Sequence, residues 1–155
     1  MRDTKQVIVF RTEFPNSKGG IKKMSKGKMI AQGSHASMAF LSSEMAYSIE
    51  QVKHSAALAS PRPEAVLDGV SFSARFTEAQ RHWLTNSFAK VCLQVKTEEE
   101  LDAVHDLALA AGMTVHKIVD SGRTEFDGVP TATCVAIGPD WVDMFEGITD
   151  DLRML

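Results

Sequence analysis

Two groups of polar residues in this sequence have the types and spacing that catalysis by charge and proton transfer requires. Lys28, Gln32 and His35 are spaced four and three residues apart, so they line one face of a predicted helix. The second group, Asp120-Ser121-Gly122-Arg123-Thr124, directly follows a predicted strand. A lysine can stabilise developing negative charge, and an aspartate can orient or deprotonate water. The simpler interpretations are a solvated helix face and an ordinary Asp-Ser-Gly turn, and the residues alone leave them open.

Hydrophobic periodicity predicts the elements that carry these groups. Residues 5–11 are a short, β-branched apolar run, typical of a strand buried on both faces, and a breaker-rich loop follows. From Ser25, a candidate N-cap, small and apolar residues recur at spacings of three and four, which predicts a helix to about residue 49. Further strands are predicted at 90–96, 113–119 and 133–137, and further helices at 77–88, 97–112 and from Asp140 onward.

The order of these elements predicts an α/β fold. Strand and helix alternate through the first three strands, which indicates parallel crossovers with helices on both faces of one sheet. The link over residues 120–132 is too short for a crossover helix, so we expect the fourth strand to run antiparallel to its neighbour. If the third strand is parallel to the first, both polar groups lie at the carboxyl edge of the sheet, where such folds bind ligands.

The length predicts a single domain over residues 1–155, interrupted by an extended excursion at about 42–88. Within it, residues 55–76 contain two prolines and no sustained period.

Charge is distributed unevenly along the chain. Residues 1–28 contain eight lysines and arginines against two acidic residues, a net charge of +6, whereas the remainder has nine against eighteen, a net charge of −9. This asymmetry predicts that an otherwise acidic protein has a local basic face that can bind phosphates. An ordinary solvated Lys-rich loop is the alternative interpretation.

Several common kinds of site are not supported by the sequence. Gly27-Lys28 is followed by Met29 rather than Ser or Thr, which argues against a phosphate-binding P-loop. Ser34 and His35 are neighbours on a helix and point about 100° apart, and there is no G-x-S-x-G motif. The five histidines lack metal-binding spacing, so neither a metal nor a cofactor is expected. Cys92 and Cys134 lie within apolar runs and are predicted to be reduced core residues.

Five segments together resemble the peptidyl-tRNA hydrolase type 2 family. They are VIVFRTE, MSKGKMIAQGSHASMAF, KVCLQVKTEEEL, VDSGRTEF and GVPTATCVAIGP, and they cover roughly residues 5–40 and 89–155. The K-G-K-x-x-A-Q-x-x-H-A and D-x-G-x-T patterns are the most specific. The resemblance implies a three-layer α/β/α sandwich with a four-stranded mixed, mostly parallel sheet. It also implies metal-independent hydrolysis of the ester that joins a peptide to tRNA. A non-catalytic RNA-binding or protein-adaptor module on the same fold is the alternative.

The resemblance also assigns residues. The matching functional positions are Lys28, Gln32, His35, Asp120, Thr124 and Thr133. Thr131 is a rival for the role of Thr133, because the preceding loop differs by one residue from the common form, and Ser25 stands where the family usually has glycine. The expected contacts to the tRNA backbone are Lys18, Lys22, Lys23, Lys26 and Arg123.

The partners expected are peptidyl-tRNA and a second copy of the chain, with no DNA and no membrane. The only apolar run near the N-terminus, residues 7–10, is far too short for a signal peptide or a membrane span, so a cytoplasmic location is predicted.

Overall fold

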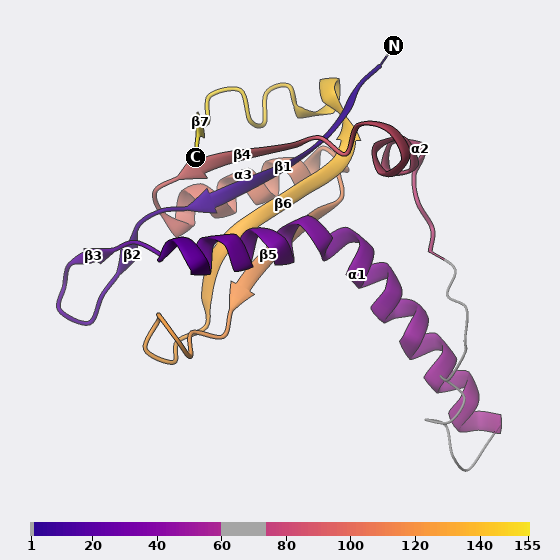
Figure 1. Cartoon of the computed structure of the whole chain (residues 1–155), viewed down its shortest axis with the longest axis horizontal. Coiled ribbons are helices and arrows are strands. Elements are labelled where there is room, and N and C mark those ends of the chain that lie inside the picture. The colour runs from indigo at the N-terminus through magenta and orange to yellow at the C-terminus, as the bar shows by residue number, and fades with distance from the viewer. Residues whose placement is uncertain (1, 60–73) are drawn as a thin grey trace.

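The computed structural model of this chain describes residues 2–59 and 74–155, with the backbone alone for residues 56–59. A sheet in the order β5-β6-β1-β4-β7 forms its centre (Figure 1). Its strands are β1 (Thr4–Arg11), β4 (Lys90–Val95), β5 (Val115–Asp120), β6 (Thr131–Trp141) and β7 (Arg153–Met154). A small hairpin, β2 (Phe14–Pro15) with β3 (Ile21–Lys22), follows β1.

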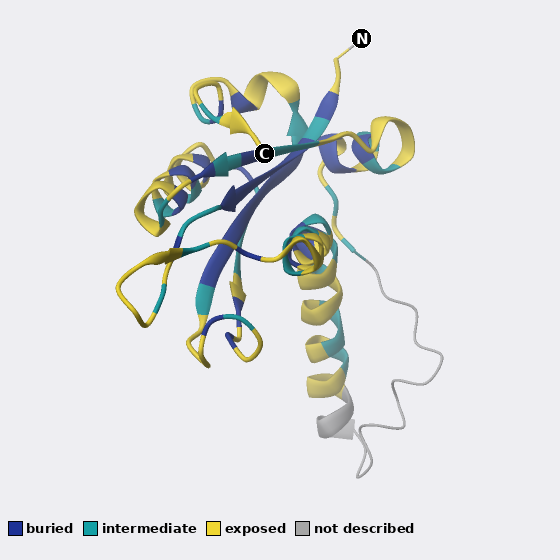
Figure 2. Ribbon diagram, turned by 60° about the vertical axis from the view of Figure 1, so that its left-hand side comes forward, coloured by how far each residue is buried: buried dark blue, intermediate teal, exposed yellow. Residues whose placement is uncertain are grey.

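The helices lie on both faces of this sheet. They are α1 (Lys26–Ala59), α2 (Glu78–His82), continued by a π-helical turn over Trp83–Ser87, and α3 (Glu98–Ala110). The side chains of Leu101, Val104 and Ala108 place α3 in one apolar core, with Val7, Val9 and Val135 of the sheet. A second core on the opposite face joins Ala36 of α1 to Ile8, Phe10 and Cys134. The prediction of an α/β fold with helices on both faces is therefore confirmed, and Figure 2 shows the buried strands between the helices.

The sheet corrects two further predictions. It has five strands rather than four, because the chain returns after β6 to add the two-residue strand β7 to the edge of β4. It is also not mostly parallel in its pairing: β1 and β4 pair in parallel, whereas β6 is antiparallel to both β1 and β5. β6 forms antiparallel pairs on both of its sides because it lies between β1 and β5, which run in the same direction. The antiparallel fourth strand that the short link predicted is confirmed.

The predicted C-terminal helix from Asp140 is wrong. Asp140 and Trp141 still belong to β6, because they pair with Lys5 and Thr4 of β1. The helical structure that follows them is limited to one 3-10 turn, Val142–Phe145. The buried ring of Phe145 in the α3-side core holds this turn against the sheet.

Local sequence signals explain where the helices begin and end. Ser25 Oγ accepts a hydrogen bond from Lys28 N at 3.2 Å, which confirms the predicted N-cap of α1. Thr77 with Gln80, and Thr97 with Glu100, form capping boxes at the starts of α2 and α3. No glycine or proline interrupts residues 34–59, and α1 accordingly continues well beyond residue 49.

The excursion predicted at 42–88 contains the second half of α1, which projects from the body of the molecule, and α2 (Figures 1 and 2). Trp83 after α2 packs edge-to-face on Phe40 of α1, with ring centroids 5.8 Å apart. Residues 60–73 of the excursion lie outside the described residues.

Both cysteines are free thiols, as predicted. Burial raises the pKa of Cys134 to about 12, so this thiol stays protonated at neutral pH. Among the described residues, no helix has the length and the apolar character needed to cross a membrane.

Candidate active site

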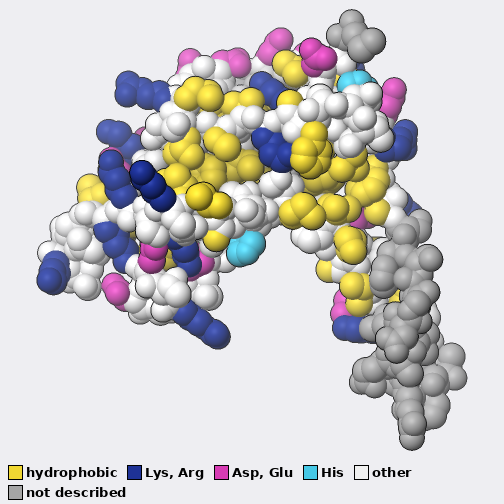
Figure 3. All heavy atoms as spheres, in the orientation of Figure 1, with side chains coloured by type: hydrophobic (Ala, Val, Ile, Leu, Met, Phe, Trp, Pro, Cys, Tyr) yellow, Lys and Arg dark blue, Asp and Glu magenta, His cyan; other side chains and the backbone are white. Residues whose placement is uncertain are grey.

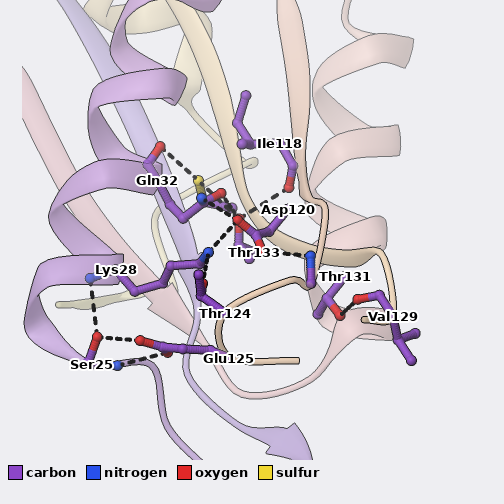
Figure 4. Close-up of polar contacts among 12 residues, drawn as sticks. Ser25, Lys28, Gln32, Ile118, Asp120, Thr124, Glu125, Val129, Thr131 and Thr133 are labelled. Carbon is purple, nitrogen blue, oxygen red and sulfur yellow. Dashed lines mark hydrogen bonds and ion pairs between the residues drawn. The ribbon is translucent and has the colours of Figure 1, made fainter. Parts of the chain in front are cut away.

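The two polar groups singled out in the sequence meet at the carboxyl edge of the sheet. Asp120 is the last residue of β5, and Lys28 lies in the first turn of α1. Lys28 Nζ lies 2.6 Å from Asp120 Oδ2 and donates a hydrogen bond to Thr124 Oγ1 at 3.0 Å (Figure 4). The expected juxtaposition at this edge is therefore present, because β5 and β1 run in the same direction with β6 between them.

Buried hydrogen bonds hold the carboxylate of Asp120 from the interior of the protein. Gln32 Nε2 donates to Asp120 Oδ2 at 2.9 Å, and Thr133 Oγ1 donates to Gln32 Oε1 at 2.7 Å. The backbone N–H of Gly122 donates to the other carboxylate oxygen, Asp120 Oδ1, at 2.8 Å. Gln32 and Thr133 are only 2% and 0% exposed, so they act on the site through Asp120. The part of the cluster that a substrate can reach consists of Lys28, Thr124 and the edge of Asp120.

A β-bulge in β6 points Thr133 towards this network. Ile118 pairs with Cys134 and Val119 with Ala132, so Thr133 is the extra residue in the ladder. Ala132 faces the α3-side core, whereas both Thr133 and Cys134 face α1. In a regular strand, neighbouring side chains would point to opposite faces. The bulge therefore supplies the hydroxyl that orients Gln32.

The electrostatics of the cluster favour an ionised Asp120. Burial alone would raise the pKa of its carboxyl group, but the hydrogen bond from Lys28, the N–H of Gly122, the charge of Lys28 and the amide of Gln32 together hold the pKa below its ordinary value. A carboxylate with a lowered pKa is a weak base, but it remains ionised at neutral pH and accepts hydrogen bonds. It is suited to orienting a water molecule more than to retaining that molecule's proton.

Comparisons with known proteins show to which family this chain belongs. The family model described as "Peptidyl-tRNA hydrolase PTH2" matches residues 4–155. The chain belongs to this family. It is 34% identical over 152 residues to the peptidyl-tRNA hydrolase of Methanopyrus kandleri, with 97% of both chains covered. It is 29% identical to that of Methanocaldococcus jannaschii, over 97% of this chain and 99% of the relative. The probable peptidyl-tRNA hydrolase 2 of Schizosaccharomyces pombe is also 29% identical, over 56% of its own length.

The resemblance drawn from the sequence motifs is thereby confirmed, and with it the activity. The chain is a peptidyl-tRNA hydrolase, and the non-catalytic module on the same fold is not favoured.

In this family member, some predicted site residues lie outside the cluster. His35 is exposed and its side chain makes no hydrogen bond with another described residue, although it lies one helical turn from Gln32. Thr131 donates its hydroxyl to the carbonyl of Val129 at 2.8 Å, away from Gln32. Figure 4 shows Thr131 and Thr133 in these different settings.

The predicted tRNA contacts divide into two kinds. Lys18, Lys23, Lys26 and Arg123 are exposed side chains on the β2–β3 hairpin, at the start of α1 and on the loop after β5. Lys22 instead donates to the backbone carbonyl of Glu125 and lies 5.1 Å over the ring of Phe126. The ammonium of Lys22 thus contributes to holding the loop as well as to the positive charge.

The sequence patterns missed one connection that shapes the site. Glu125 accepts hydrogen bonds from both the backbone N–H and the hydroxyl of Ser25, and these bonds lower the pKa of the Glu125 carboxyl group. The N-cap of α1 is thereby tied to the loop that carries Thr124. No signal in a single sequence pairs two residues that are 100 positions apart.

Among the residues that the structure describes, no three His, Cys, Asp or Glu side chains are grouped so that they could hold a metal ion. The prediction of a metal-independent reaction is tested by measuring turnover with and without EDTA.

Proposed function

We propose that Lys28, Asp120 and Thr124 carry out the hydrolysis of the peptidyl-tRNA ester, and that Gln32 and Thr133 hold Asp120 in place. The observation that carries this proposal is the buried chain of hydrogen bonds from Thr133 through Gln32 to Asp120, which ends on the partly exposed Lys28. Such a preorganised charge pair stabilises charge that develops in a transition state.

The reaction needs few groups, because the ester is already activated. The oxygen of a water molecule attacks the ester carbonyl carbon, the bond to the ribose oxygen breaks, and a proton from the water ends on that oxygen. In this proposal the carboxylate of Asp120 orients the water. The ammonium of Lys28, whose side chain is 15% exposed, stabilises the carbonyl oxygen as negative charge develops.

The threonines take different parts in this proposal. Thr124 is exposed and bonded to Lys28 Nζ, so its hydroxyl is placed to contact the water or the substrate. Thr133 is fully buried and acts as a positioning residue. The proposal gives the second threonine role to Thr133 and not to Thr131, since the hydroxyl of Thr131 is bonded elsewhere. His35 is left without a part in the chemistry.

The experiment that tests the proposal is release of the acyl group from N-acetyl-aminoacyl-tRNA, measured for wild type, Asp120→Ala and Lys28→Met, each with and without EDTA. Asp151→Ala is a matched control, because Asp151 is an exposed carboxylate outside the cluster. We expect metal-independent turnover by wild type and the control, and a collapse of kcat in both cluster variants. Variants with near-normal kcat would mean that Lys28 and Asp120 form only a structural ion pair.

The exposed basic side chains support binding of the tRNA phosphates. The elements that adjoin the site carry these side chains: the β2–β3 hairpin region, the first turn of α1 and the loop after β5 carry Lys18, Lys23, Lys26 and Arg123. Figure 3 shows lysine and arginine side chains on the left-hand side of the molecule, at and above the hairpin. Phosphate contacts release counterions, so replacing one contacting lysine by glutamine should reduce the dependence of log Kd on log salt by about 0.7 to 0.9. It should also raise KM more than it lowers kcat. The matched control is Lys53→Gln, on the projecting part of α1.

A homodimer is the assembly expected from the family resemblance. An exposed apolar groove of about 590 Å³ beside α1 supports a second copy as its occupant, because contiguous exposed apolar surface marks contacts between proteins. Ile30 and Phe88, 70% and 55% exposed, line this groove. Sedimentation should show a dimer that Ile30→Lys dissociates, and a wild type that is monomeric at micromolar concentration would refute it. The cytoplasmic location stays a prediction.

A further inference from the structure

The strand that ends in Asp120 is the edge of the sheet. In the order β5-β6-β1-β4-β7, β5 pairs with β6 alone among the described strands, so no described strand lies on the other side of its backbone (Figure 1). An unpaired edge presents a row of N–H and C=O groups that an extended chain can pair with. Here that row leads directly to the candidate catalytic carboxylate.

A groove of about 750 Å³ runs beside this strand, between β5 and α1. His35, Met38 and Ser42 of α1 line one wall, and His116 and Ile118 of β5 line the other. Its lining begins next to the active site, because His35 follows Gln32 by one turn and Ile118 precedes Asp120 by two residues. Since Lys28 and Gln32 contact the end of β5, residues 42–46 of α1 lie toward its beginning.

Among the described residues that line the groove, His116 has a buried polar atom without a hydrogen-bond partner. His116 Nε2 is buried and makes no hydrogen bond with any described residue. Burial lowers the pKa of His116, so its imidazole is neutral at physiological pH. A neutral imidazole can donate to or accept from a peptide group. The rest of the lining is largely apolar or small, which suits side chains of varied sequence.

We propose that the peptide part of peptidyl-tRNA binds as an extended strand alongside β5, parallel to it, with alternate side chains in the groove between β5 and α1. This inference rests on the proposed function. The direction follows from the chemistry: the ester is at the carboxyl end of the peptide, and only a strand parallel to β5 brings that end to Asp120 and Lys28. Pairing through the main chain does not depend on sequence, as a hydrolase acting on many different peptides requires.

The length of β5 determines how many peptide residues can pair with it, and this number can be tested. β5 has six residues, and at about 3.3 Å per residue it can pair with roughly five residues of the peptide. A substrate with one acyl residue would occupy only the end at Asp120, whereas a pentapeptide would reach the part of the groove beside Ser42. Wild type should therefore cleave N-acetyl-Ala-Ala-Ala-Ala-Leu-tRNA with a kcat/KM at least about tenfold higher than N-acetyl-Leu-tRNA, as two or three net backbone hydrogen bonds would give.

Two matched variants locate the effect. Ser42→Trp fills the far part of the groove and should remove the preference for the longer substrate while leaving cleavage of N-acetyl-Leu-tRNA unchanged. Ser55→Trp, at an exposed serine of the same helix outside the groove, should keep both rates. Equal rates for the two substrates in wild type, or a preference that survives in Ser42→Trp, would overturn the inference. No cleavage of either substrate by wild type would instead contradict the hydrolase activity on which the proposed function rests.

Hydrogen exchange gives a readout that needs neither turnover nor a variant. The same pentapeptide joined through an amide to 3′-amino-3′-deoxyadenosine cannot be cleaved as an ester. Its binding should slow exchange of backbone amides in β5, and unchanged exchange in β5 at saturation would overturn the inference.

Discussion

Replacing Thr133 by valine removes one buried hydroxyl and keeps the branched shape of the side chain. In the native protein that hydroxyl donates to Gln32 Oε1 at 2.7 Å, and Gln32 in turn donates to Asp120. The variant leaves the amide oxygen of Gln32 buried without its donor. The amide is then free to rotate away from the carboxylate, so one change tests whether the buried network supports the site.

The structure sets the size of the effect. A buried polar group left without a partner costs about 1–3 kcal/mol. For a domain of this size, about 2 kcal/mol corresponds to a fall in Tm of roughly 4–8 °C. If the positioning of Asp120 loses about 1.4 kcal/mol, kcat falls about tenfold. KM should change little, since Thr133 is fully buried and does not contact substrate.

The assay is acyl release from N-acetyl-aminoacyl-tRNA together with a thermal melt, for Thr133→Val and Thr133→Ser. Serine keeps the hydroxyl, and we expect it to retain most of kcat despite the loss of a methyl group. A valine variant that loses stability but keeps full kcat would refute the idea that the network positions Asp120. A serine variant as inactive as valine would show that packing, rather than the hydrogen bond, is responsible.

Three further predictions follow from the same site. Because the folded pKa of Asp120 lies below its ordinary value of 3.8, its stabilisation is complete above that value and is lost as the pH falls through the folded pKa. Urea unfolding should accordingly show a stability difference between wild type and Asp120→Asn that is constant from about pH 5 to 8 and shrinks below about pH 4. Gly122→Ala should lower both Tm and kcat, because Gly122 has φ +79° and an added Cβ would lie 2.2 Å from Val129 O; a variant with native values would contradict the loop geometry. Thr131→Val should leave kcat unchanged and stability within about 0.5 kcal/mol, measured by the same assays, and a large loss of kcat would return Thr131 to the candidate threonine role.

Local signals made most elements predictable. Ser25, Thr77 and Thr97 begin helices where the sequence indicated, because a capping side chain acts on backbone groups only a few residues away. The predicted end of the last strand at residue 137 and the predicted helix from Asp140 were wrong, because contacts between distant segments decide the structure there. Asp140 and Trp141 are strand residues through their pairing with β1, and that contact joins opposite ends of the chain.

What the sequence by itself determined was the identity of the chemical groups and the elements that carry them. The spacing of Lys28 and Gln32 places them on one helix face, and the position of Asp120 at the end of an apolar run places it at a strand terminus. What only the tertiary structure decided was how these groups connect. The bulge at Thr133 and the bonds between Ser25 and Glu125 depend on strand register and on the packing of α1. Register and packing are set by contacts between distant segments, which no local pattern encodes.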